Sequence, residues 1–505
     1  GRRLWFERID ADQADFQAAL GTLLDADPDR ALAMAAALWP YWVLRGSFGE
    51  GLDRLQAALA ASGGRSPARV EALLGSFAIR MHWTGAGEDD PAPGEALALA
   101  TALGDPPGMA RTVFFAGVQA WVRGEPGAAR RAFLRCAAIA RRAGLTLTQA
   151  CAAHALACVA WSQGKGGQAR QRLRAALALA LRAVTSDDGA VAGEQAVGGT
   201  GEFWQLGIAP VGTSWWLGAP RLVFEEPAAA LQAAAGLSAV ACVRASMGSL
   251  ARAAGDHDEA AGLLDEALGL FEQAGDDDGA ALVFARQGNL AIAVGRPRQA
   301  AEFLTRSLEI RRDLGDQCGI GLAQLSLGRV EIGSGRLERA GELFTEAAAS
   351  FRAGGDRPAL IQALIRLGEL QVARLSTGED QAGGGLRLTG AVGHAGRGGR
   401  GGDRPRGGAA AAGVSGDAVR LLESAVTMLR AMGHGVQLGL GLAALAEACQ
   451  GAGQQARAAA AAREATALLA RAPGGPGRRH ALDRLAAIAR AGQPERAEST
   501  RAGQG

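Results

Sequence analysis

Small and large apolar residues recur with a fixed period in the middle of this 505-residue chain. The pattern is most regular between residues 236 and 375, where equivalent positions lie 40 residues apart and the first of them is always glycine: Gly248, Gly288, Gly328 and Gly368. In the first three repeats a second glycine, an alanine, a large apolar residue and a Gly-Asp pair follow, for example Gly295, Ala300, Leu304 and Gly315-Asp316. A constant period of this size is typical of a protein built from stacked repeats.

One repeat, from Gly275 to Gly315, shows which elements the pattern predicts. Apolar residues at helical spacing over 281–292 predict a first helix, and Asp276 stands where a residue that caps the helix is preferred. Gly295 can end that helix in a left-handed turn, and Pro297 suits the first turn of a second helix. Each repeat is therefore predicted to be a helix hairpin.

The small residues predict how the hairpins pack. Any side chain at Gly288 would hold the two helices of the repeat apart, and Ala300 has the same role on the second helix. One such hairpin cannot bury its own apolar face, so neighbouring hairpins must stack on both sides. We expect an all-α solenoid, a right-handed superhelix with an inner and an outer face.

These positions resemble the tetratricopeptide repeat, in particular Gly248, Ala251, Gly255, Ala260, Leu264 and Ala267. The period of 40 exceeds the commoner 34, which leaves each helix room for nearly one more turn. The longer unit resembles the C-terminal repeat arm of bacterial signalling ATPases of the STAND class and of LuxR-family transcriptional regulators, of the actinobacterial type. This resemblance implies a sensor or protein-interaction arm that controls an ATPase.

The leading segment 1–62 carries a pattern of its own, with Trp5, an Asp-Phe pair at 15–16, and Trp39 and Trp42 ahead of Arg45-Gly46. It resembles the segment that joins the ATPase core to the repeats in those regulators, so we expect that core upstream in a full-length relative. Lys165 is the sole lysine, and the Ser or Thr of a phosphate-binding loop does not follow it. We therefore expect no ATPase activity in this chain and no cofactor, and we expect the arm not to be an enzyme.

Composition and the register of the 40-residue repeat divide the chain into seven segments. They are helices leading from an ATPase core (1–62), tetratricopeptide-like repeats (63–183), an irregular unit with an insertion (184–235), regular repeats (236–375), a Gly/Arg-rich linker (376–416), C-terminal repeats (417–490) and a disordered tail (491–505).

Two of these segments allow a second interpretation. The irregular unit contains Trp204, Trp215 and Trp216, and it is either a degenerate repeat with an insertion or a lid over a ligand. The linker contains Arg-Gly-Gly triplets that could contact RNA, although no aromatic residue for base stacking accompanies them. Its G-x-G-x-x-G match at Gly396 lacks the strand and helix that a nucleotide site needs.

Charge and cysteine content limit the classes of function. The net charge is only +2 and no face is visibly basic, so we do not expect the repeats to contact nucleic acid directly. Six cysteines without a signal peptide favour a reducing cytoplasm, and no apolar run is long enough to span a membrane. Arginine replaces lysine almost throughout, which indicates a bacterium with a GC-rich genome.

The resemblance also places candidate binding residues. In tetratricopeptide repeats the second, fifth, ninth and twelfth positions of the first helix line the inner groove. With Gly117 as position eight, the groove or partner-binding residues are Arg111, Phe114, Val118, Trp121, Cys151, His154, Cys158, Trp161, Arg252, Asn289, Arg329 and Glu369. Trp121 and Trp161 occupy the same position in adjacent repeats, where they are either a binding wall or packing.

Cys151, His154 and Cys158 fall on one face of a predicted helix. They are the most metal-like group in the chain, but zinc would still need a fourth ligand or water. Buried cysteines and a hydrogen-bonded histidine are the alternative. We commit to no metal site.

Three functional hypotheses follow. The first is an arm that binds an effector or a protein partner in its groove and controls an ATPase or a LuxR-type regulator. The second is a freestanding tetratricopeptide scaffold for protein–protein interaction. The third is a metal-dependent or nucleic-acid function centred on the Cys/His group or on the Arg/Gly linker.

Overall fold

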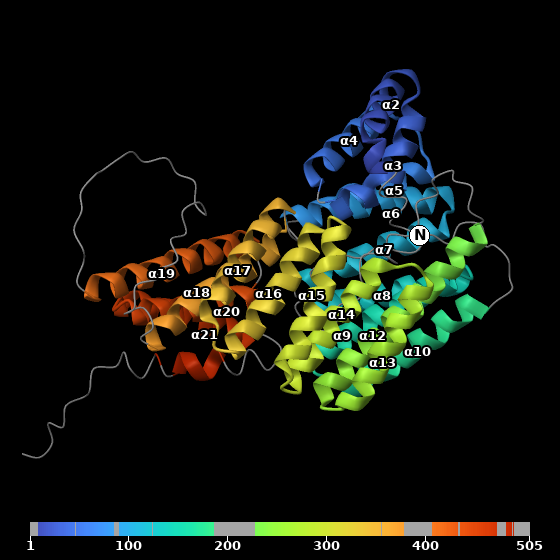
Figure 1. Ribbon diagram of the computed structural model, residues 1–505. Coiled ribbons are helices and arrows are strands. Elements are labelled where there is room, and N and C mark those ends of the chain that lie inside the picture. Colours follow the sequence, from blue (N-terminus) through green and yellow to red (C-terminus); the bar gives the residue numbers. More distant parts are fainter. Residues whose placement is uncertain are drawn as a thin grey trace, which may run out of the picture. The chain divides into compact units, whose positions relative to one another are not determined.

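The computed structural model describes residues 9–45, 47–84, 90–123, 125–185, 228–354, 356–377, 407–432, 435–471, 481–486 and 488. Every regular element in these ranges is a helix (Figure 1). Between residues 13 and 333, and again between residues 407 and 471, each helix packs against the next one in the structure. The predicted all-α solenoid of helix hairpins is therefore confirmed. The chain divides into two compact units, Gly1–Ser334 with Glu346–Leu360 and Gly335–Thr345 with Ile361–Gly505.

The first unit begins with three helices that precede the repeats: α2 (Gln13–Ala26), α3 (Pro28–Arg45) and α4 (Phe48–Ala61). Trp39 and Trp42 of α3 are buried. The indole Nε1 of Trp39 donates a hydrogen bond to Glu71 at 3.1 Å, on the first helix after this group. The leading helices are thus joined to the repeats by both apolar packing and a polar contact.

Paired helices make up the rest of the first unit. They are α5 (Pro67–Thr84), α6 (Ala92–Leu103), α7 (Pro106–Val122), α8 (Pro126–Arg142), α9 (Thr146–Ser162), α10 (Gly166–Thr185), α12 (Ala228–Ala254), α13 (His257–Gln273), α14 (Asp277–Ala293), α15 (Pro297–Asp313) and α16 (Gln317–Gly333). We call α5, α7, α9, α12, α14 and α16 the first helices, because each opens a hairpin. Each first helix contacts the next one in this series.

The second unit contains residues 337–345 of α17 (Leu337–Ala353) and most of α18 (Arg357–Thr377). It continues with α19 (Gly407–Met432), α20 (Gly435–Gly451) and α21 (Gln455–Arg471), and residues 481–486 are also helical. A Cβ atom at Gly368 of α18 would lie 2.6 Å from Cγ of Leu422 of α19, so these two helices cross closely.

Two helices begin earlier than the sequence pattern predicts. Helix α12 starts at Ala228, inside the segment 184–235, and α19 starts at Gly407, inside the predicted linker 376–416. A run of alanines opens α12, and another follows the first two glycines of α19; alanine is the residue with the highest helix propensity. The repeat pattern shows only which residues pack, so it does not detect a helix that extends beyond its packed part.

Residues 186–227 lie outside the described residues, and so do their tryptophans at 204, 215 and 216. The hairpin series resumes after them. Helices α10 and α12 pack against each other. A Cβ atom at Gly236 of α12 would lie 2.8 Å from Cγ2 of Val184 at the end of α10. The end of α10 and the packed part of α12 therefore lie next to each other.

The predicted close crossing within a hairpin is present at Gly288. A Cβ atom there would lie 2.7 Å from Cγ of Leu304 and 3.4 Å from the carbonyl oxygen of Ala300, both on α15. Both residues are fully buried. Gly295, in the turn between the two helices, has φ of 73°, a conformation that side chains disfavour. Gly288 is therefore required for close helix contact, and Gly295 for its backbone conformation.

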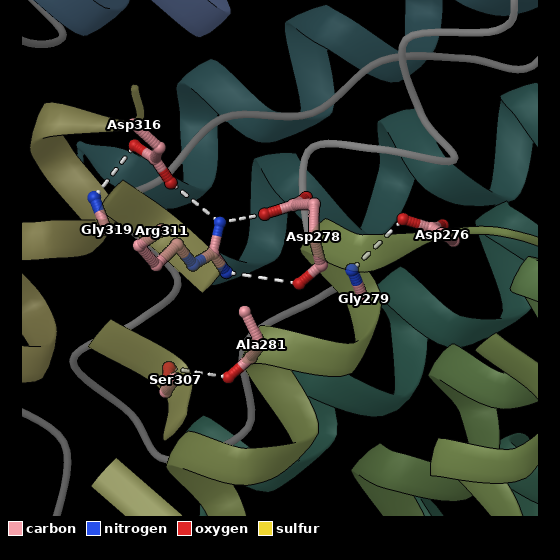
Figure 2. Close-up of polar contacts among 8 residues, drawn as sticks. All are labelled: Asp276, Asp278, Gly279, Ala281, Ser307, Arg311, Asp316 and Gly319. Atoms are coloured by element: carbon pink, nitrogen blue, oxygen red, sulfur yellow. Dashed lines mark hydrogen bonds and ion pairs between the residues drawn. The ribbon is translucent and has the colours of Figure 1, made fainter. Parts of the chain in front are cut away.

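Polar contacts join neighbouring hairpins, and Figure 2 shows those between α14, α15 and α16. Asp276 caps α14 by accepting a hydrogen bond from the Gly279 backbone N–H at 3.0 Å. It also accepts one from the Ser238 hydroxyl of α12 at 2.8 Å. Asp316 caps α16 in the same way, since it accepts from the Gly319 backbone N–H at 2.8 Å. The repeated Gly-Asp pair therefore satisfies backbone donors at the start of the first helices.

A buried guanidinium completes this junction. Arg311 of α15 is only 4% exposed, and its Nη1 pairs with Asp278 of α14 and with the capping carboxylate of Asp316 at 2.6 Å. Its Nη2 also donates to the Asp278 carbonyl at 3.3 Å (Figure 2). One side chain therefore holds together a hairpin and the helix that follows it.

We predict that Gly288→Ala lowers stability by about 1–3 kcal/mol, because the added methyl group overlaps Leu304. Gly262→Ala on α13 is the matched control, since a Cβ atom there meets nothing within 4 Å. That change should stabilise the helix by roughly 0.5–1 kcal/mol. Urea unfolding followed by circular dichroism measures both, and effects of equal sign would contradict the packing role of Gly288.

We predict that Arg311→Met destabilises the chain by about 3–5 kcal/mol, because it leaves the Asp278 carboxylate buried without its counter-charge. Arg306→Met on the same helix is the control. The Arg306–Glu309 pair is exposed on both sides, so its loss should cost at most about 1 kcal/mol. Similar unfolding midpoints for the two variants would show that the junction is not held by Arg311.

Candidate functional site

The candidate site is the surface of the first helices on which the sequence placed the groove residues. Hydrogen bonds fix the register of these helices. Arg329 of α16 donates to the Asn289 side chain of α14 at 3.3 Å, and Arg286 of α14 donates to the Ser246 hydroxyl of α12 at 3.4 Å. Both pairs are 40 residues apart in sequence. Equivalent positions of neighbouring first helices therefore lie side by side.

Half of the predicted groove residues are buried. They are Arg111, Phe114, Val118, Cys151, His154 and Cys158. Arg111 pairs with Glu71 of α5 at 2.9 Å. The Phe114 ring packs against Phe133 of α8 with a centroid distance of 5.0 Å. In this structure these side chains are part of the core, so a ligand on the surface does not reach them.

The other half is at least partly exposed. These residues are Trp121, Trp161, Arg252, Asn289, Arg329 and Glu369. Glu369 belongs to the second unit, where it pairs with Arg366 at 2.8 Å. The remaining five residues follow one another along α7, α9, α12, α14 and α16 of the first unit.

The two tryptophans share one apolar base. Trp121 and Trp161 pack against a cluster that includes Ala157, Leu173 and Leu250, contributed by α9, α10 and α12. Both indoles stay partly exposed at the edge of this cluster. A rigid aromatic surface over a packed base can bind an apolar side chain without losing much conformational entropy.

His154 is held by a neighbouring helix. Its Nε2 lies 2.9 Å from the Ser246 hydroxyl of α12, and its Nδ1 has no hydrogen-bond partner. Burial, together with the positive charge of Arg286, lowers the pKa of His154 to about 3. Burial raises the pKa of the Cys158 thiol to about 12. Both side chains are therefore neutral near pH 7.

The described residues contain no group of three or more His, Cys, Asp or Glu side chains arranged to hold a metal ion. Lys165, the sole lysine, is exposed and donates from Nζ to Gln163 at 2.9 Å. The Gly396 motif and the Arg-Gly-Gly triplets lie outside the described residues. Within the described ranges, no helix combines the length and the apolar character that crossing a membrane requires.

Sequence reasoning missed a second row of residues on the same helices. Ser246 and Arg286 occupy the sixth position of their repeats, and neither belongs to the predicted groove set. Ser326 stands at the same position one repeat later. The signal in the sequence was a polar residue at the same position of three successive repeats, 40 residues apart, on helices that are otherwise mostly apolar.

Comparison with known proteins supports the repeat assignment. Residues 239–313 match the family model of the tetratricopeptide repeat. No curated protein matches the chain.

Solved structures with a related arrangement of helices include a STAND protein with a tetratricopeptide repeat sensor from Pyrococcus horikoshii. It has 12% identity over 86% of this chain and 51% of that chain, with a TM-score of 0.45. Aspartyl phosphate phosphatase F from Bacillus subtilis has 9% identity over 88% and 95%, with a TM-score of 0.42. A Rap protein complexed with competence and sporulation factor has 11% identity over 84% and 99%, with a TM-score of 0.40.

We predict that His154→Gln reduces the loss of stability in acid. Between pH 6.5 and pH 3 the unfolded chain protonates His154 and the folded chain does not, so stability falls as pH decreases through this window. From pH 7 to pH 5 this histidine should account for about 2 kcal/mol. Urea unfolding of the wild type and the variant at both pH values measures the difference. Identical pH dependence would mean that His154 is not held neutral.

Proposed function

We propose that the chain is a non-enzymatic interaction arm that binds a polypeptide segment along its first helices. The observation that carries the proposal is the pair Trp121 and Trp161. Both are partly exposed, both stand at the twelfth position of adjacent repeats, and both rest on one buried cluster. Aromatic side chains with a packed base are frequent anchors of protein interfaces.

The register of the helices supports an extended partner. Trp121, Trp161 and Arg252 hold the twelfth position of their repeats, and Asn289 and Arg329 hold the ninth, which is one turn away on the same helix face. These exposed residues therefore form a row along five consecutive first helices, each of which contacts the next. An extended polypeptide can contact such a row in several repeats at once. Small ligands need a concave pocket instead.

A more specific role follows from the resemblance of the repeats and of the leading helices to the arm of STAND-class ATPases and LuxR-family regulators. In that context the chain is the sensor arm of a cytoplasmic bacterial signalling ATPase or LuxR-type regulator. A bound partner would favour one curvature of the stacked hairpins and thereby dock or release the ATPase core. A P-loop encoded in frame ahead of Gly1 favours this context, and its absence from the gene favours a freestanding scaffold.

We predict that replacing both tryptophans, Trp121→Ala and Trp161→Ala, abolishes enrichment when short random peptides displayed on phage are selected on the immobilised chain. The matched control is Leu134→Ala with Leu181→Ala, which removes exposed apolar side chains from α8 and α10, the second helices of the same hairpins. The control should select the same peptides as the wild type. Unchanged selection by the tryptophan variant would refute this binding surface.

A further inference from the structure

Arg252 has an unusual environment for an arginine on a repeat surface. It lies on α12 and is partly exposed, and its side chain forms neither a hydrogen bond nor an ion pair with the described residues. Burial lowers its pKa below the usual range. A guanidinium that has lost part of its hydration without gaining an acceptor is costly, and an added anion would remove that cost.

A second guanidinium increases the positive charge at this point. Arg286 on the next first helix is 7% exposed and donates to Ser246 at 3.4 Å. Burial and then the positive charge of Arg252 lower the pKa of Arg286 to about 10, so it stays charged near neutral pH.

An apolar surface adjoins these charges. Trp161 holds the same repeat position on α9 that Arg252 holds on α12, and these two helices are in contact. Leu250 of α12 belongs to the apolar cluster on which Trp161 packs, and Met247 of α12 packs against the same cluster. An aromatic wall and a partly desolvated cation thus occupy neighbouring places in the row of exposed residues.

We propose that Arg252, with Arg286 behind it, binds the carboxylate of an Asp or Glu side chain in a peptide whose adjacent apolar residue packs on Trp161. This inference rests on the proposed function and names the chemistry of the partner. The acid is a side chain within the peptide, because first helices continue on both sides of α12, with α7 and α9 before it and α14 and α16 after it. Guanidinium and carboxylate have complementary charge and hydrogen-bond geometry.

Selection of short random peptides on the full chain, on Arg252→Gln and on Arg298→Gln tests the proposal. Arg298 is an exposed arginine of α15 and serves as the control. Peptides selected on the wild type and on the control should share an Asp or Glu next to an aromatic or aliphatic residue. Peptides selected on Arg252→Gln should lose the acidic residue and keep the apolar one. The same acidic preference on all three proteins would overturn the proposal.

The two proposals can fail separately in this experiment. If peptides are enriched on the wild type but carry no preferred acid, the role of Arg252 is wrong while the peptide-binding function stands. If no peptide is enriched on the wild type, the proposed function itself fails and the role of Arg252 fails with it.

Fluorescence anisotropy with one selected, fluorescein-labelled peptide then isolates the charge pair. Neutralising the peptide's acid and replacing Arg252 by Gln should each weaken binding about tenfold, and the two changes together should weaken it no further. Additive losses would show that the two groups do not meet. Circular dichroism melting of Arg252→Gln should give a midpoint no lower than that of the wild type, because the change removes a partly desolvated charge whose side chain makes no internal polar contact.

Discussion

The close crossing of two helices at Gly288 is the constraint on which the rest of the solenoid depends. With no side chain there, Leu304 of the second helix fits directly against the first helix. The hairpin then has a dense interior of alanine, leucine and phenylalanine and leaves its other faces to its neighbours. Since each hairpin of the first unit contacts mainly the next, that unit is a chain of nearest-neighbour interfaces.

Apolar packing alone would allow neighbouring hairpins to slide or rotate, and the polar junctions restrict this freedom. Arg311 reaches a carboxylate on its own hairpin and the capping carboxylate of the next helix, so it requires one relative placement of three helices. Its burial makes any other arrangement expensive, since an unpaired charge would remain inside. This fixed placement also brings Asn289 of α14 and Arg329 of α16, the last two residues of the row, next to each other.

The sequence predicts the hairpins well, because the 40-residue period and the Gly-Asp pairs report local and nearest-neighbour packing. It predicts the site less well. Positions two, five and nine of α7 and α9 were expected on an open face, yet Phe114 and His154 are buried. Both helices are rich in small residues, so adjacent elements approach closely and cover them. The sequence also does not predict that the Arg252 side chain lacks an internal partner. Pairing depends on which side chains of separate helices meet, and the repeat period does not describe that.

The closeness of Val184 at the end of α10 to Gly236 of α12 has a consequence for how this protein can vary. The free energy of closing a connection grows only with the logarithm of its length, so each doubling costs about 0.6 kcal/mol. Residues can therefore be added or removed between α10 and α12 while the hairpins on either side keep their register. This junction is the place where new sequence could be acquired at little thermodynamic risk to the solenoid.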